Sequence, residues 1–174
     1  MTGIAGLEAF DKTSGDLNAV IESPRGCRNK YTFDRKRGLF YLSGILTVGH
    51  SFPFDFGFIP GTLGGDGDPL DVLLVMDEPA FTGCVVPARL IGVIEAEQTE
   101  KGETMRNDRL IAVPANSTTH TGIRSLKDLG KAVLDQIEHF FISYNDMKGK
   151  TFTPIARKGP VLAKRLVKDS LTKK

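Results

Sequence analysis

The chain has 174 residues, of which 40% are hydrophobic and 25% charged, and its formal net charge is +2 at pH 7. A chain of this length can bury a core of its own, so we expect one domain over residues 1–174. The near balance of charge argues against a protein dedicated to nucleic acid. No apolar run approaches the roughly 20 residues of a membrane-spanning helix, so we expect no membrane partner.

The cysteines and the N-terminal residues bear on the compartment. Cys27 and Cys84 do not make a disulfide framework, which is typical of a reducing compartment. Residues 1–12 lack the basic-then-apolar order of a signal peptide. We therefore expect a cytoplasmic protein.

The first two thirds of the chain are typical of a β-protein. Residues 1–16 are small, polar and glycine-bearing, which predicts an arm. Six segments have the composition of short strands: 17–22, 29–34, 39–42, 71–76, 84–96 and 110–113. Residues 52–59 alternate aromatic residues with Pro and Gly, which predicts a bent, partly buried segment. Residues 98–108 form a charged excursion between two of the strands.

The pattern changes after Thr121. Ser125, followed three residues later by Asp128, forms a capping box, and apolar residues then recur at helical spacing as far as Tyr144. A second helix is predicted over residues 160–171, followed by a frayed tail at 172–174. Short strands followed by helices predict an α+β fold with a small barrel of the oligonucleotide/oligosaccharide-binding (OB) type.

Three carboxylates fall within six residues, between a glycine-rich loop and an apolar run: Asp66, Asp68 and Asp71. Gly67 and Pro69 make a regular strand unfavourable, so the three side chains can converge. Mg²⁺ takes one or two carboxylates and completes its shell with water and phosphate oxygens. Because clustered acids repel one another without a cation, we interpret the loop as a metal site. The alternative is a polar turn whose acids cap backbone amides.

Two other loop motifs are excluded. An EF-hand loop needs a ligand at its fifth position and Gly at its sixth, where this chain has Leu70 and Asp71. A Walker A loop needs a leading glycine, but Tyr144 stands at that position ahead of the Gly-Lys-Thr sequence at 149–151.

The acidic loop, Asp66-Gly67-Asp68-Pro69-Leu70-Asp71-Val72, is similar to the signature of family I inorganic pyrophosphatases, Asp-x-Asp-Pro-φ-Asp-φ, where φ is apolar. Other segments resemble that family in the same order: Glu22-Ser23-Pro24, Lys30-Tyr31, Phe52 to Ile59, Leu110 to Pro114, and His139 to Tyr144. The resemblance extends from about residue 17 to residue 150, and it identifies the chain as a divergent member of the family.

The resemblance implies a five-stranded closed β-barrel (OB-fold-like) with flanking helices. It also implies an enzyme, an inorganic diphosphatase that hydrolyses pyrophosphate to two orthophosphates with Mg²⁺; Mn²⁺ and Zn²⁺ are candidate substitutes. A bound metal ion lowers the pKa of its water from about 15.7 toward about 7 and screens the phosphoryl oxygens. The resemblance further suggests a homo-oligomer, by analogy a hexamer.

The resemblance also implies roles for the acids. Asp66 and Asp71 would hold metal, and Asp68 would orient or deprotonate the attacking water as the catalytic residue. Glu22 would hold further metals that arrive with the substrate. Glu100 is the best candidate for the remaining metal acid of the charged excursion.

The late metal position stays open between Asp108 and Asn107. Lys30, Arg109 and Tyr144 would bind phosphate oxygens, and Arg109 stands where the family usually has Lys. Arg keeps the charge but replaces a compact ammonium with a broad fork.

The chain departs from the family pattern at several positions where phosphate contacts are expected: Thr32, Gly44, Phe52, Phe56 and Asn145. Each lost charge or hydroxyl at a phosphate site would cost roughly 2–4 kcal/mol of transition-state stabilisation. Five basic neighbours are candidates to compensate: Arg35, Arg37, Arg106, Lys148 and Lys150. The alternatives are a hydrolase of another phosphoanhydride or phosphate ester, and a catalytically weakened binding protein with this fold.

Overall fold

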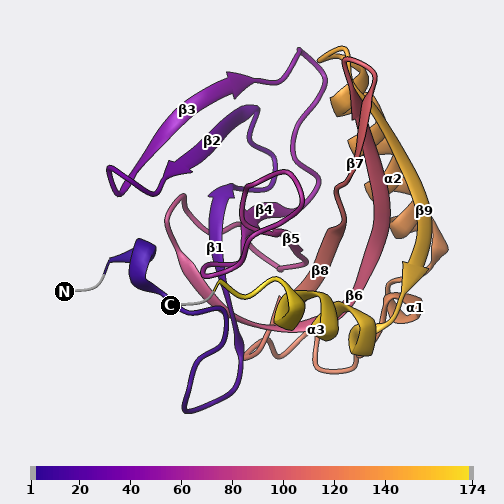
Figure 1. Cartoon of the computed structure of the whole chain (residues 1–174). Helices are drawn as coiled ribbons and strands as arrows, with labels where there is room; N and C mark the ends of the chain where they lie inside the picture. Colours follow the sequence, from indigo (N-terminus) through magenta and orange to yellow (C-terminus); the bar gives the residue numbers. More distant parts are fainter. Residues whose placement is uncertain (1–2, 173–174) are drawn as a thin grey trace.

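The computed structural model describes residues 3–172 (Figure 1). Its helices are the 3₁₀ turn η1 (Ile4–Gly6), α1 (Leu126–Leu129), α2 (Lys131–Asp146) and α3 (Pro160–Asp169). Its strands are β1 (Leu17–Ser23), β2 (Asn29–Asp34), β3 (Leu39–Ile45), β4 (Asp55–Phe58), β5 (Asp71–Leu74), β6 (Val85–Glu100), β7 (Glu103–Arg106), β8 (Arg109–Pro114) and β9 (Thr151–Lys158).

Five strands close into a barrel. They follow the order β1-β4-β5-β8-β6, and β6 returns to pair with β1. Strand β6 is 16 residues long, so it also pairs with β7 and β9 beyond the ring. Strands β2 and β3 form a separate hairpin, which Figure 1 shows at the upper left. The expected α+β barrel is confirmed.

Two helices cover the barrel, and each brings an apolar face to it. Helix α2 packs against β9, and Ile137 and Phe141 from α2 join Ile94 and Ile111 in one apolar cluster. Helix α3 packs against β6 and buries Val167 in a second cluster. Burial of these side chains is the main source of stability for helices of this length.

The helical region differs from the prediction because of one glycine. The capping box is present, since the Asp128 carboxylate accepts a hydrogen bond of 2.8 Å from the Ser125 amide. Gly130 then adopts φ 80°, a conformation that ends a helix, so the predicted helix is two helices, α1 and α2.

The strand region also differs. Residues 98–108 are not an irregular excursion: β6 continues through them to Glu100 and turns back into β7, with Lys101 and Gly102 at φ 51° and φ 83°. Strand β9 was not predicted, and it pairs with the outer part of β6. Pro154, which opposes Ala96 where the register shifts, argues against a strand in the sequence but is tolerated at such an irregularity.

The two ends of the described chain are tied down. In the expected arm, Ala9 is buried and its carbonyl accepts a 2.8 Å hydrogen bond from the Asn18 amide. At the other end, the Thr172 amide donates to the Gly61 carbonyl at 2.9 Å. The remaining residues of the expected arm and tail, 1–2 and 173–174, lie outside the described residues. Within residues 3–172, no helix is long and apolar enough to cross a membrane.

Strands β1 and β4 approach each other closely at Gly57. A Cβ atom at this position would lie 1.9 Å from the Val20 carbonyl oxygen, a backbone atom that cannot move aside. The close approach fixes β4, and with it the loop that leads to β5.

We therefore expect Gly57→Ala to lower the free energy of unfolding by about 3 kcal/mol, the upper end of the cost of overpacking. Urea unfolding measures this. Gly122→Ala is the matched control, because a Cβ atom at Gly122 meets nothing within 4 Å. Equal midpoints for the two variants would contradict the assignment.

Candidate active site

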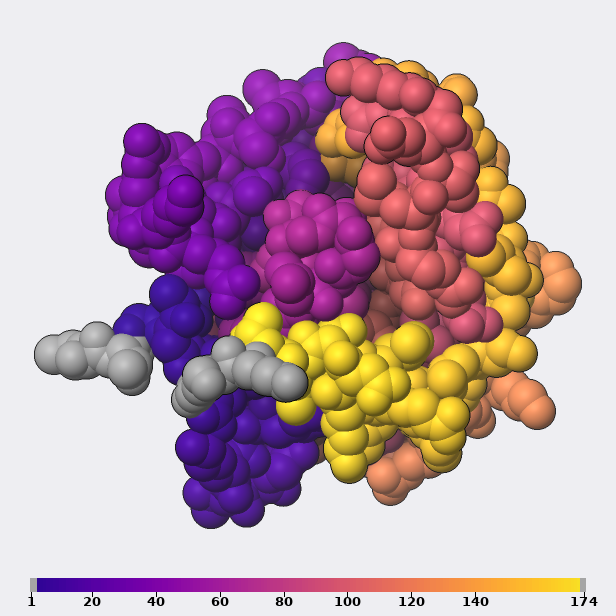
Figure 2. Space-filling model, in the orientation of Figure 1, coloured from indigo at the N-terminus to yellow at the C-terminus, as the bar shows by residue number. Residues whose placement is uncertain are grey.

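The acidic loop joins β4 to β5 and lies at one edge of a cavity. Asp66, Asp68 and Asp71 all line this cavity, which has a volume of about 180 Å³. Figure 2 shows the loop in magenta near the centre of one face, with α3 below it. Asp66 Oδ1 also accepts a 3.1 Å hydrogen bond from the Asp68 amide, and Gly67 supplies the turn with φ 87°. The loop is thus both a turn in which an acid caps a backbone amide and one wall of the cavity, lined by carboxylates.

An ion pair joins the acidic loop to β8. Arg109 Nη1 lies 2.7 Å from Asp71 Oδ2, and the Arg109 side chain is only 5% exposed. The parallel pairing of β5 with β8 brings the first residues of both strands to the same edge of the barrel. The guanidinium carbon lies 4.7 Å from the ring centroid of Phe141 and 5.2 Å from that of Phe152. Arg109 Nε is buried with no hydrogen-bond partner among residues 3–172.

Burial and neighbouring charges act on Asp71 in opposite directions. Burial raises the pKa of the Asp71 carboxyl, and the carboxylates of Asp66 and Asp68 add to the rise. The Arg109 and Lys30 charges oppose it. Burial thus outweighs the neighbouring cations in their effect on the pKa of Asp71.

Glu22 stands in an adjoining cavity of about 310 Å³, which shares Lys30, Asp68, Asp71 and Lys148 with the first. Its side chain is buried and accepts a 2.8 Å hydrogen bond from the Phe33 amide. Burial raises the pKa of Glu22 to about 7, and the Lys30 charge opposes the rise.

Basic and hydroxyl groups form the other walls of the 180 Å³ cavity. Lys30, Tyr144, Lys148 and Lys150 line it with Arg109. The Lys148 ammonium donates a hydrogen bond to the Tyr144 hydroxyl and lies 4.2 Å from the ring centroid. Burial, followed by the charges of Lys30 and Lys150, lowers the pKa of Lys148 to about 8. Burial also raises the pKa of Tyr144.

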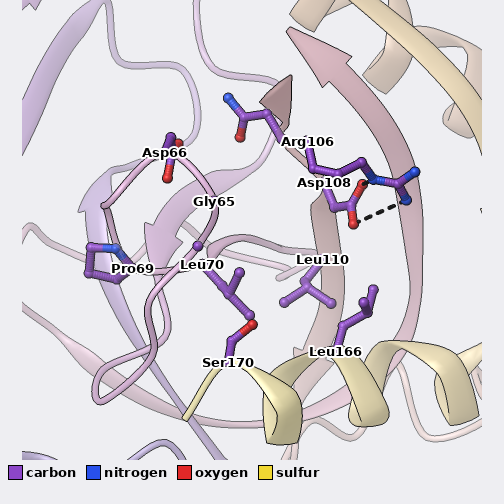
Figure 3. Close-up of a pocket in the computed structure, with 11 residues that line it drawn as sticks. Gly65, Asp66, Pro69, Leu70, Arg106, Asp108, Leu110, Leu166 and Ser170 are labelled. Carbon is purple, nitrogen blue, oxygen red and sulfur yellow. Dashed lines mark hydrogen bonds and ion pairs between the residues drawn. The ribbon is translucent and has the colours of Figure 1, made fainter. Parts of the chain in front are cut away.

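Two of the expected metal acids do not line either cavity. Asp108 accepts hydrogen bonds of 2.9 Å from Arg106 Nε and from the Ala96 amide. It lines a separate cavity of about 360 Å³, which Figure 3 shows. Glu100 pairs instead with Lys150 at 2.8 Å. Of the two residues left open for the late position, Asn107 is the one that lines the 180 Å³ cavity.

The positions that depart from the family pattern are built into the core or the cavity walls. Phe52 and Phe56 are buried and stacked, with ring centroids 5.5 Å apart. Lys30 Nζ lies 5.3 Å from the Phe56 ring centroid. Asn145 is buried and donates to the Phe141 carbonyl at 2.8 Å. No phosphate-binding hydroxyl or charge comes from these three positions.

Sequence reasoning missed Gln98, which lines the 180 Å³ cavity beside Asn107. Asn107 Nδ2 donates to Gln98 Oε1 at 3.0 Å, and Asn107 Oδ1 accepts from Arg109 Nη1. Gln98 lies two residues before Glu100 on β6, so strand alternation could have marked it as sharing a face with Glu100.

The cavity residues fit a hard divalent cation. Three carboxylates on one wall offer oxygen donors, and a cation there would oppose the burial and the carboxylate repulsion that together raise the pKa of Asp71. Within residues 3–172, no three acid, imidazole or thiolate groups are gathered closely enough to hold an ion by themselves. Water and a bound anion must supply the other ligands, as is usual for Mg²⁺.

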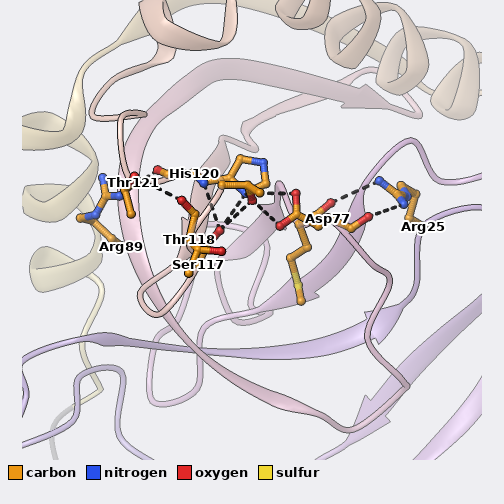
Figure 4. A network of polar contacts seen from close by, with 9 residues as sticks. Arg25, Asp77, Arg89, Ser117, Thr118, His120 and Thr121 are labelled. Carbon is orange, nitrogen blue, oxygen red and sulfur yellow. Dashed lines mark hydrogen bonds and ion pairs between the residues drawn. The ribbon is translucent and has the colours of Figure 1, made fainter.

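A second polar network lies around His120 and carries no chemistry of its own (Figure 4). His120 Nδ1 lies 3.0 Å from Ser117 Oγ and 3.7 Å from Asp77 Oδ1. In a catalytic Ser-His-Asp triad, the serine hydroxyl and the carboxylate contact opposite nitrogens of the imidazole ring. Here both approach Nδ1, so the network ties the loop before α1 to residues 76–77, which Arg25 also contacts.

The barrel, the acidic wall and the basic walls together define a class: metal-assisted enzymes that act on a small phosphorylated anion. A family model described as inorganic pyrophosphatase matches residues 19–173. The chain therefore belongs to the inorganic pyrophosphatase family, as the resemblance predicted.

Individual relatives agree with this assignment. The chain is 42% identical over 137 residues to the inorganic pyrophosphatase of Synechocystis sp., covering 79% of each chain. It is 36% identical over 157 residues to that of Geobacillus stearothermophilus, covering 90% of this chain and 93% of the relative. The crystal structure of the Thermus thermophilus inorganic pyrophosphatase superposes with a TM-score of 0.88 at 33% identity, covering 97% of both chains.

We expect Arg109→Met to lower the free energy of unfolding by about 2–4 kcal/mol, because it leaves the Asp71 carboxylate unpaired in a largely buried setting. Urea unfolding in EDTA measures this. The double variant Asp71→Asn/Arg109→Met should lose less than the sum of the two single changes. Arg124→Met, at an exposed position, is the control for the side-chain change. Additive losses would show that the pair is not coupled.

Proposed function

We propose that this chain hydrolyses inorganic pyrophosphate to two orthophosphates in a reaction that needs Mg²⁺. The observation that carries the proposal is one cavity that joins three loop carboxylates to Lys30, Arg109 and Tyr144. The printed names of the similar proteins agree with it.

The acids have separate proposed roles. Asp66 and Asp71 hold the metal ion from the loop, and Glu22 holds a further ion in the adjoining cavity. When bound, the metal ion acidifies water and neutralises phosphoryl oxygens. Asp68 orients the attacking water and accepts its proton. Its carboxylate can do so because it lines both cavities and so stands at their junction.

The basic residues have the task of neutralising the substrate. Lys30 and Tyr144 bind phosphoryl oxygens in the proposal. Arg109 also binds them, while its guanidinium keeps its ion pair with Asp71. Lys148, which was only a candidate from the sequence, joins them because it lines both cavities. Asp108 and Glu100 are left out of the proposed metal set, since neither lines either of the two cavities.

A second candidate is hydrolysis of another small phosphoanhydride or phosphate ester. The buried Phe52 and Phe56 rings favour it, because they leave part of the wall without hydroxyl donors. A panel of phosphate compounds in the same assay distinguishes the two.

We also propose that the chain is a cytoplasmic homo-oligomer, by analogy a hexamer. Exposed apolar side chains on β3, Leu39, Leu42 and Ile45, support a contact between copies. Light scattering on the purified chain would measure the mass, and a monomer would contradict the oligomer.

Phosphate release from pyrophosphate tests the function. We expect release only when Mg²⁺ is supplied, and a fall of about 10²–10⁴-fold in Asp68→Asn, which removes the proton acceptor. Asp169→Asn, at an exposed position of α3, is the matched control and should retain the wild-type rate. If wild type releases no more phosphate than Asp68→Asn with Mg²⁺, Mn²⁺ or Zn²⁺, the proposed function is wrong.

A further inference from the structure

The wall of the 180 Å³ cavity beside Arg109 is made of two side-chain amides. Gln98 comes from β6, and Asn107 lies directly after β7, where its backbone amide donates to the Ala96 carbonyl at 2.9 Å. Both side chains are partly buried. This wall is neutral, whereas the loop wall carries three carboxylates.

The hydrogen bonds fix which way both amides face. A guanidinium can only donate, so Asn107 must turn Oδ1 toward Arg109 Nη1. Its Nδ2 then faces Gln98 and donates to Oε1 at 3.0 Å. Gln98 therefore keeps its own Nε2 group free, and this group has no partner among residues 3–172. The orientation follows from the network and does not depend on telling nitrogen from oxygen.

The electrostatics at this wall favour an anion. Both amide oxygens already accept hydrogen bonds, and the Asn107 oxygen accepts from the Arg109 guanidinium. A divalent cation placed here would find two neutral amides and no carboxylate among the side chains of this wall. A phosphoryl oxygen, in contrast, would accept from Gln98 Nε2, and hydrogen bonds to charged groups are stronger than neutral ones.

We propose that Gln98 Nε2 donates directly to a phosphoryl oxygen of pyrophosphate, and that Asn107 is a positioning residue that fixes the Gln98 amide. This wall binds no metal ion, so the divalent ions bind only on the side of the loop acids and Glu22. The proposal rests on the proposed function, because it takes pyrophosphate as the substrate.

Binding of imidodiphosphate, a pyrophosphate analogue with a nitrogen bridge, tests the donor without turnover. Calorimetry at saturating Mg²⁺ should show binding about tenfold or more weaker in Gln98→Met, which keeps the side-chain length but removes the donor. Gln136→Met makes the same change on the exposed face of α2 and should bind like wild type. Urea unfolding confirms that the variants are folded.

A second measurement counts ions. Equilibrium dialysis with Mn²⁺ and imidodiphosphate should show about one more bound ion per chain in Asn107→Asp than in wild type. The new carboxylate gives the wall an anionic oxygen that can coordinate the additional ion. This readout keeps the proposal testable even if Gln98→Met does not fold.

The outcomes separate this inference from the proposed function. If wild type binds imidodiphosphate and Gln98→Met binds it equally well, Gln98 is not a donor to the substrate. If wild type already binds as many Mn²⁺ ions as Asn107→Asp, the wall already holds a cation. Either result overturns the inference and leaves the proposed function standing. If wild type does not bind imidodiphosphate at all, both are wrong.

Discussion

The ion pair between Arg109 and Asp71 is the contact on which the cavity depends. Arg109 packs against the rings of Phe141 and Phe152, where a charge without a partner would be costly. Asp71 supplies that partner, and in doing so it ties the acidic loop to β8 at 2.7 Å. The same guanidinium orients the Asn107 amide. One buried cation thus positions a loop acid and orients an amide on the neighbouring wall of the cavity.

The barrel makes this contact possible through strand order. β5 and β8 are parallel neighbours, so their first residues, Asp71 and Arg109, meet at one edge although they lie far apart in the chain. Gly57 lets β4 approach β1 closely enough to fix the other end of the loop. The acids are therefore positioned by the sheet, and the glycines within the loop only allow it to turn.

The sequence predicted what depends on local pattern. Strand composition predicted the barrel, the capping box predicted where the helical region begins, and the acidic signature predicted the loop acids. Each of these signals is encoded within a few residues. The sequence did not predict β9, whose pairing with β6 is a long-range contact, nor the break at Gly130. The cavity residue Gln98 was missed because the sequence reasoning favoured acids, although the alternation along β6 could have marked it; the structure shows that it lines the cavity.

A wall made of two amides differs from a wall of carboxylates in what it requires to bind an anion. A carboxylate that faces a polyanionic substrate needs a cation between them, whereas an amide with a free N–H group does not. In the proposed mode of binding, the Gln98–Asn107 pair therefore needs no ion between this wall and the substrate. Lys148 and Lys150 add positive charge across the same cavity. In the proposed mode of binding, direct donors on other walls thus replace the phosphate-binding groups absent at Phe56 and Asn145, and a small anion is neutralised with fewer metal ions.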